Sequence, residues 1–439
     1  MKFKSVQASP SQLLVLVFLF FILLGTLLLK LPLATHVPMS WIDTLFTAAS
    51  AMTVTGLAVV DTGRDFTLFG QLMILILIQV GGLGIMSFAV LIFIMLGKKI
   101  GLKERLLIQQ SLNQTSIGGI IKLIRSLFFY SFSIEILAMA ILAFQWVPEY
   151  GWNRGMFYSL FHSVSAFNNA GFSIWPDSLM RYEGNPLVNI VITLLFITGG
   201  IGFTVLSDIW HKRNFKQLSL HSKLMIWGTF IINIMAMIIV FSLEYQNQMT
   251  LGTLPLDEKL WGSYFQAVTP RTAGFNTLDI GSLHESTLTL MLLLMFVGAG
   301  SASTGGGIKL TTFIVILLSA ASFLKGKNRI SIARKTIKDK AVIRSLAIST
   351  ISILFILSAV FILNITEPKP FLHILFEIVS AFGTVGLSMG ITAELSPVGK
   401  LLIAFIMFLG KLGPLTLAFS LARPEQENIR YSSEDILTG

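Results

Sequence analysis

The chain has 439 residues, of which 54% are hydrophobic and only 12% are charged. Soluble domains carry about a quarter charged residues, so this composition and the positive mean hydropathy indicate a protein whose solvent is the lipid bilayer. Cysteine is absent, which excludes disulfides and thiolate metal sites. The net charge of +10 does not indicate nucleic-acid binding, because the basic residues occur in blocks between apolar segments.

Eight long apolar segments follow one another along the chain, and a span takes about 20 residues. They are residues 11–29, 68–96, 127–147, 186–210, 224–243, 286–324, 345–363 and 397–421. The first is expected to be retained, because its apolar stretch is long for a signal peptide. Four shorter apolar segments, which cannot span, lie between them and begin near Trp41, Phe157, Trp261 and Phe371.

The basic residues predict the orientation of these segments. Loops on one side, together with both chain ends, hold 22 Lys and Arg residues, whereas loops on the other side hold seven. Because loops rich in Lys and Arg stay in the cytoplasm, both termini are expected to be cytoplasmic. The four short segments are then expected on the outer side of the membrane.

A repeat accompanies the short segments: an aromatic residue lies ten positions before a glycine in four stretches. The stretches are Phe46 to Gly56 (FTAASAMTVTG), Phe161 to Gly171 (FHSVSAFNNAG), Tyr264 to Gly274 (YFQAVTPRTAG) and Phe376 to Gly386 (FEIVSAFGTVG). One span precedes and one follows each stretch, so the repeated unit is span, short helix, glycine turn and span.

This organisation predicts an all-α integral membrane protein with eight transmembrane helices and four re-entrant pore helices around a pseudo-four-fold pore. The predicted units are residues 1–97, 98–210, 211–324 and 325–422, followed by a cytoplasmic tail at 423–439. Asp43 is expected to be the N-cap of the first short helix.

The glycine turns are the predicted site of ion selection. A cation that crosses a bilayer exchanges its water for other oxygens, and rings of backbone carbonyls supply them without net charge. Glycine adopts the positive φ of such a turn freely. The predicted selectivity filter consists of Val54, Thr55, Gly56, Asn169, Ala170, Gly171, Thr272, Ala273, Gly274, Thr384, Val385 and Gly386. Because only the glycine is shared, we expect one good carbonyl ring and modest discrimination between K⁺ and Na⁺.

A second set of glycines recurs 24 to 28 residues after the filter glycines, beginning at Gly81, Gly199, Gly298 and Gly410. Close helix packing is one interpretation of such glycines in spans. Their recurrence at one depth also fits a ring of hinges in pore-lining helices.

The segment at 286–324 is too long for one span, and residues 298–307 within it (GAGSASTGGG) carry no bulky side chain. Broken helices mark ion pathways in transporters, so we predict a gate beneath the filter, with a small-residue packing surface as the alternative. The predicted gate residues are Gly298, Gly300, Ser301, Ser303, Thr304, Gly305, Gly306, Gly307, Lys309 and Lys411. Lys309 is expected to hold this loop closed through hydrogen bonds or to snorkel, and Lys411 to project into the pore below the filter.

Other polar residues in apolar segments have weaker predicted roles. Arg271 is expected to brace the filter from behind, against Glu377, or to snorkel to the outer surface. His162 and His373 are expected to be ordinary core residues of the short helices. Glu135 and Asp208 receive no role.

With these motifs the chain resembles the Trk/Ktr/HKT superfamily of potassium transporters, most closely its Ktr-type (KtrB-like) membrane subunits. The resemblance covers nearly the whole chain and rests on Thr53-Val-Thr-Gly-Leu57, Phe167-Asn-Asn-Ala-Gly-Phe172, Thr269-Pro-Arg-Thr-Ala-Gly-Phe275 and Ala381-Phe-Gly-Thr-Val-Gly-Leu387. It implies potassium uptake through a gated pore in a bacterial plasma membrane. It also implies a homodimer with one pore per subunit and a cytoplasmic nucleotide-binding RCK-type regulatory subunit (KtrA/KtrC-like). Sodium is implied as an activator or co-permeant ion. An arginine is common in the superfamily at the place of Lys411.

Two other protein classes compete with a potassium pore. An alternating-access secondary cation transporter would use inverted repeats, whereas the four units here share one orientation. A membrane-embedded enzyme would need a cluster of acids, histidines or serines in its spans. We therefore predict a potassium transporter without enzymatic activity or an organic cofactor.

Overall fold

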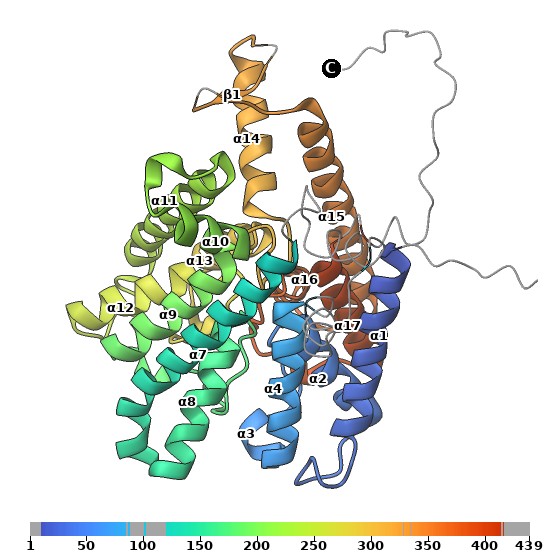
Figure 1. Cartoon of the computed structure of the whole chain (residues 1–439). Coiled ribbons are helices and arrows are strands. Elements are labelled where there is room, and N and C mark those ends of the chain that lie inside the picture. The colour runs from blue at the N-terminus through green and yellow to red at the C-terminus, as the bar shows by residue number, and fades with distance from the viewer. Residues whose placement is uncertain are drawn as a thin grey trace, which may run out of the picture.

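The computed structural model describes residues 10–84, 120–327, 329–333 and 335–413, together with the single residues 87, 101 and 416. The predicted all-α class is confirmed (Figure 1). The second half of the segment at 68–96, most of the loop that follows it, the unit boundary at 97 and the tail at 423–439 lie outside the described residues.

The α-helices are α1 (Pro10–Leu29), α2 (Trp41–Thr53), α3 (Thr62–Asp65), α4 (Leu68–Leu83), α7 (Ile120–Tyr150), α8 (Trp152–Phe167), α9 (Pro186–Ile201), α10 (Phe203–Lys212), α11 (Leu220–Glu244), α12 (Leu256–Val268), α13 (Glu285–Phe296), α14 (Leu310–Leu324), α15 (Asp339–Thr366), α16 (Phe371–Gly383) and α17 (Pro397–Leu412). The short 3-10 helices are η1 (Met180–Tyr182), η2 (Phe215–Gln217), η3 (Ile280–Ser282) and η4 (Thr392–Glu394). A small antiparallel pair of strands, β1 (Ser331–Ile332) and β2 (Lys335–Thr336), joins α14 to α15.

Within the described part of the chain, four helices are long and apolar enough to cross a membrane alone: α1, α7, α11 and α15. A fifth span is formed if α9 and α10, which meet at 94°, are counted together. Helices α4, α13 and α17 have 16, 12 and 16 residues, and most of the predicted spans beyond Gly84 and Gly413 lie outside the described part of the chain.

A glycine ends each of α4, α9 and α17. Gly84, Gly202 and Gly413 follow α4, α9 and α17 with φ values of 85°, 104° and 84°. This conformation strains any residue with a side chain, so the helix stops there. In three units the regular helix therefore stops just after the glycine pair.

The same glycine pairs also permit close packing. A Cβ atom at Gly81 would lie 1.9 Å from the carbonyl oxygen of Met52, and one at Gly199 would lie 1.9 Å from that of Phe167. A Cβ atom at Gly410 would lie 2.0 Å from the carbonyl oxygen of Phe382. The packing interpretation is thus supported in these three units, and the ring of hinges stays a prediction. Gly298 differs, since its nearest neighbour is the carbonyl oxygen of Gly306 in its own loop.

The predicted short helices are α2, α8, α12 and α16, and their C-terminal halves are buried. The prediction that Asp43 is the N-cap of α2 is wrong. Ser40 is the N-cap, since its Oγ accepts a hydrogen bond from the Asp43 N–H at 3.0 Å, while the Asp43 carboxylate accepts one from Ser40 Oγ at 2.7 Å. This reciprocal pair places Asp43 in the first turn rather than before it.

The short helices are also contacted by helices of neighbouring units. Helix α4 packs against α8, α9 against α12, α13 against α16, and α17 against α2. Each contact joins the later span of one predicted unit to the short helix of the next, and the last contact returns to the first unit. The Lys400–Asp43 ion pair, at 2.8 Å, joins α17 to α2 in the same way.

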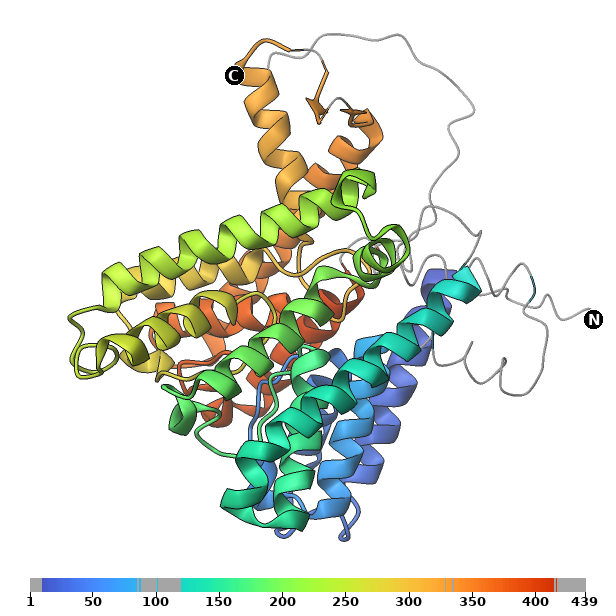
Figure 2. The same ribbon diagram turned by 60° about the vertical axis from the view of Figure 1, so that its left-hand side comes forward.

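The end of α14 and the start of α15 project beyond the other described helices, and β1 and β2 lie between them (Figures 1 and 2). Exposed basic residues gather along this hairpin, including Lys325, Lys335 and Lys340. This region belongs to the set of basic loops that the sequence predicts to be cytoplasmic.

Candidate functional site

Each glycine loop has the same unusual backbone. The residue two positions before each glycine has a positive φ although it carries a side chain: Val54 52°, Asn169 56°, Thr272 70° and Thr384 49°. The glycines also have positive φ: Gly56 90°, Gly171 68°, Gly274 78° and Gly386 93°. Such backbone is costly and persists only where the surroundings impose it, so its recurrence four times indicates a functional constraint.

The four loops touch one another at their glycines. A Cβ atom at Gly56 would lie 2.3 Å from the carbonyl oxygen of Ala170, in the second loop. One at Gly171 would lie 3.0 Å from the carbonyl oxygen of Ala273, in the third.

The remaining two contacts close the circuit. A Cβ atom at Gly274 would lie 2.2 Å from the carbonyl oxygen of Val385, in the fourth loop. One at Gly386 would lie 2.1 Å from that of Thr55, in the first. The residues predicted for the filter are therefore brought together, and the backbones of adjacent loops leave no room for a side chain at these glycines.

Hydroxyl groups at the ends of the short helices hold these loops, and the sequence analysis missed them. Ser50 and Ser380, each six residues before a filter glycine, accept hydrogen bonds from the Gly56 and Gly386 N–H groups at 3.1 Å. Ser165, at the same offset, donates to the carbonyl oxygen of Phe172 at 2.7 Å. The recurring serine was visible in three of the four aligned stretches.

The predicted break in the segment at 286–324 is confirmed, since α13 ends at Phe296 and α14 begins at Leu310. The ends of the connecting loop lie side by side. Gly298 N–H donates to the carbonyl oxygen of Ile308 at 2.9 Å. This loop, residues 298–307, is called the gate loop below.

The gate loop contacts three of the four filter loops through the side chains of their positive-φ residues. Thr304 Oγ1 donates to Asn169 Oδ1 at 2.7 Å, and Gly306 N–H donates to Thr384 Oγ1 at 2.8 Å. A Cβ atom at Gly305 would lie 2.3 Å from Thr272 Oγ1. The gate loop is therefore packed directly against the filter loops.

Two lysines hold the gate loop by its carbonyl groups. Lys309 Nζ donates to the carbonyl oxygen of Gly305 at 2.6 Å, which confirms the predicted hydrogen bond. Lys411 Nζ, from α17, donates to the carbonyl oxygen of Thr304 at 2.5 Å. The Lys411 side chain thus reaches the gate loop itself.

The predicted contact between Arg271 and Glu377 is not formed. Arg271 turns towards α11, where its Nη1 donates to Asn233 Oδ1 at 3.3 Å. The residue lines a small cavity together with Thr229, and its buried Nε has no hydrogen-bond partner among the described residues. Glu377 instead accepts hydrogen bonds from Ser388, at 2.8 Å, and from Thr392. Glu377 therefore holds the chain that follows the fourth filter glycine, while Arg271 contacts the first span of its own unit.

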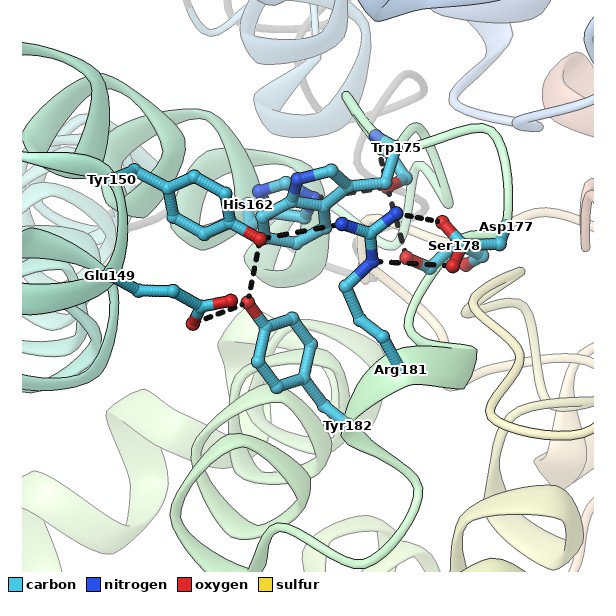
Figure 3. A network of polar contacts seen from close by, with 9 residues as sticks. Glu149, Tyr150, His162, Trp175, Asp177, Ser178, Arg181 and Tyr182 are labelled. Atoms are coloured by element: carbon cyan, nitrogen blue, oxygen red, sulfur yellow. Dashed lines mark hydrogen bonds and ion pairs between the residues drawn. The ribbon is translucent and has the colours of Figure 1, made fainter.

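An aromatic and polar network joins α7 and α8 to the chain that follows the second filter glycine (Figure 3). Trp175 stacks on His162 with ring centres 4.3 Å apart, and Arg181 pairs with Asp177 at 2.8 Å. His162 is fully buried, and its nitrogens lie 2.8 Å from the Tyr158 carbonyl oxygen and 3.1 Å from Ser173 Oγ. The core role predicted for His162 is confirmed, whereas His373 is only partly buried.

Replacing His162 by alanine should lower the unfolding temperature of the purified protein. The change leaves a cavity beneath Trp175 and removes two hydrogen-bond partners, a loss of about 2–4 kcal/mol in a core. The exposed His36 supplies the control substitution. Equal unfolding temperatures for His162→Ala and His36→Ala would contradict this role.

Asp208, to which no role was assigned, has a structural one. It pairs with Lys212 at 2.6 Å and accepts hydrogen bonds from Ser219 N–H and Ser222 Oγ, at 2.8 and 2.7 Å. It thereby fastens α10 to the start of α11.

Comparisons with known proteins agree with this architecture. The model of the TrkH family, described as cation transport protein, matches residues 7–431. The chain is 59% identical over 436 residues to Ktr system potassium uptake protein B of Bacillus subtilis (strain 168), covering 99% of this chain and 98% of the relative. It is 40% identical to the protein of the same name from Vibrio alginolyticus, covering 99% and 96%.

Two further relatives extend the comparison. The potassium/sodium uptake protein NtpJ of Enterococcus hirae is 37% identical over 446 residues, covering 99% of this chain and 98% of the relative. The crystal structure of the potassium transporter TrkH from Vibrio parahaemolyticus superimposes with a TM-score of 0.73 at 21% identity, covering 96% of this chain and 87% of that one. At that identity, the likeness concerns the fold.

Proposed function

The chain belongs to the TrkH family of cation transport proteins, as a potassium-uptake membrane subunit, and we propose that K⁺ crosses it where the four glycine loops meet. The observation that carries this proposal is the closed series of contacts from the first loop to the fourth and back to the first. The circular order of helix contacts supports it independently. Four units in a circle make a pseudo-four-fold pore.

The proposed ion ligands are the carbonyl oxygens of Thr55, Ala170, Ala273 and Val385. Each of these oxygens lies against the filter glycine of an adjacent loop, and the four oxygens together form a single ring. The residues before them differ between loops in size and polarity, which argues against a stack of several equivalent rings. A single ring implies modest discrimination between K⁺ and Na⁺.

The gate loop is proposed to close the path on the cytoplasmic side of this ring. Its hydrogen bonds to Asn169 and Thr384 keep it against the filter, and Lys309 and Lys411 hold its carbonyl groups. Alternating access remains the second candidate mechanism, but a small hydrogen-bonded loop beneath a ring favours local gating over a rearrangement of whole units. The chain is not an enzyme, in keeping with its transporter relatives.

The proposed setting is a bacterial plasma membrane with both termini in the cytoplasm, so that the α14–α15 hairpin projects into the cytoplasm. The units at 1–97, 98–210, 211–324 and 325–422 remain proposals, as does a homodimer. The name of the Ktr system relatives supports a partner regulatory subunit, which we propose to be a nucleotide-binding RCK-type ring. The basic hairpin and the tail at 423–439 are its proposed docking surfaces. The potassium/sodium relative supports sodium as a second cation, either as activator or as co-permeant.

Expression in a host that lacks its own potassium uptake tests the function. The chain, together with a regulatory subunit, should restore growth at low potassium. Uptake of ⁸⁶Rb⁺ into proteoliposomes measures the same activity without the host. Correctly inserted protein that neither restores growth nor takes up Rb⁺ would contradict the proposal.

A further inference from the structure

A carboxylate lies inside the membrane part of the protein, directly behind the second filter loop. Glu135 belongs to α7 and is only 3% exposed. Acidic residues in membrane helices are expensive and usually have a function. The gate and the filter described above do not use this one.

The carboxylate is held by amide groups from two other helices. Gln79 Nε2, on α4, donates to both carboxylate oxygens at 3.0 and 3.1 Å. Asn168 Nδ2, at the end of α8, lies 3.3 Å from Glu135 Oε1 and 2.7 Å from Gln79 Oε1. The amide N–H groups point at the carboxylate, so the cluster is built to hold side chains in place rather than to bind a cation.

Asn168 connects this cluster to the filter. It is the last residue before Asn169, where the backbone turns to positive φ. The Asn169 side chain contacts Thr304 of the gate loop and Thr272 of the third filter loop, at 2.7 and 3.2 Å. Gly82 packs against the other side of Asn168, since a Cβ atom there would lie 2.0 Å from Asn168 Oδ1. Asn168 is thereby fixed from both sides.

The other three loops lack this arrangement. The residues three positions before their glycines are Thr53, Arg271 and Gly383. Thr53 bonds to the carbonyl oxygen of Ala49 in its own helix, and Arg271 reaches Asn233. Among the described residues, a carboxylate contacts this position only in the second loop.

We propose that Glu135 is a positioning residue for potassium selection, which acts through Asn168 on the filter backbone at Asn169–Gly171. Gln79 orients the carboxylate. The inference rests on the proposed filter and adds a second layer behind it. Loss of the carboxylate removes one acceptor of Asn168 and releases Gln79, whose Oε1 is a second acceptor, so that the Asn168 side chain keeps only its bond to the Val164 carbonyl oxygen at 2.9 Å. The second loop then departs from the geometry that the ion ring requires.

Rubidium and sodium uptake by proteoliposomes tests this role with Glu135→Ala, Glu135→Gln and Asn168→Ala. Glu135→Ala should raise the half-saturating cation concentration about tenfold, the effect expected from loss of a charged hydrogen bond, with a smaller change in maximal rate. Glutamine keeps one acceptor oxygen and should recover most of the affinity. The Glu135→Ala/Asn168→Ala double variant should be no worse than the single ones, because both break one linkage.

Glu244 supplies a matched control, since this buried acid lies at the far end of α11 and bonds to Asn247, Thr250 and Thr287. Glu244→Ala should reduce stability without changing the half-saturating concentration. If Glu135→Ala does not fold, the half-saturating concentration of the Asn168→Ala variant alone tests the positioning role. Wild-type affinity and selectivity in the Glu135 and Asn168 variants would overturn the proposal. A Gly171→Ser variant measured in parallel distinguishes the filter hypothesis from the positioning role of Glu135. Unchanged ion selection in Gly171→Ser would contradict the filter, whereas altered selection in Gly171→Ser with unchanged Glu135 and Asn168 variants would contradict only the positioning role.

Discussion

Replacing Gly386 by serine is expected to remove most of the preference for K⁺ and to raise the half-saturating K⁺ concentration by about tenfold or more. The residue has a φ of 93°, and its Cβ would lie 2.1 Å from the carbonyl oxygen of Thr55. A backbone oxygen cannot move aside as a side chain does. The strained conformation alone costs about 1–3 kcal/mol, and each 1.4 kcal/mol corresponds to about a tenfold change in affinity. Uptake of K⁺ and Na⁺ in proteoliposomes measures both effects.

A substitution at Gly390 distinguishes the effect of backbone strain from the effect of a steric clash with a neighbouring loop. The φ of Gly390, 90°, is nearly the same, but a Cβ there would have nothing within 4 Å. Gly390→Ala should therefore destabilise its turn by the same backbone strain, about 1–3 kcal/mol, and leave ion selection intact. Equal selectivity in the Gly386→Ser, Gly390→Ala and unaltered proteins would show that the glycine loops do not form the filter.

Shortening the gate loop by removal of residues 301–303 is expected to raise uptake and to weaken its control by the regulatory subunit. A shorter loop cannot reach both Asn169 and Thr384, which it contacts at 2.7 and 2.8 Å. Loss of a buried hydrogen bond costs about 1–3 kcal/mol, enough for about a tenfold shift between closed and open states. Uptake by proteoliposomes with and without the regulatory subunit measures this shift.

A point variant tests the same contact more gently. Thr304→Val keeps the shape of the side chain but removes the hydroxyl that donates to Asn169, and should also raise uptake. Ser301→Ala is its control, since Ser301 contacts Thr311 rather than a filter residue. Unchanged or reduced uptake in both the shortened protein and Thr304→Val would contradict the gate.

Much of the site was predictable because it depends on backbone conformations that only certain residue types favour. Four glycines at matched spacing and a run of small residues at 298–307 are local signals, since they state where a helix cannot continue. The contact of Lys309 with its own loop is also local, over four residues.

Contacts between segments that are distant in the sequence were harder to predict. Gln79, Glu135 and Asn168 come from three helices, and only their packing brings the amides to the carboxylate. Arg271 was assigned to Glu377 in an adjacent unit, yet it reaches Asn233 in its own. Hydropathy likewise did not predict the 94° bend between α9 and α10, because it does not register the positive φ of Gly202.

The most direct test of the account is to locate the ion. Crystals of the protein prepared in Rb⁺ should show an anomalous-scattering peak enclosed by the carbonyl oxygens of Thr55, Ala170, Ala273 and Val385. A transport-competent protein with its Rb⁺ peak elsewhere, and none among these four oxygens, would contradict the claim that the glycine loops select the ion.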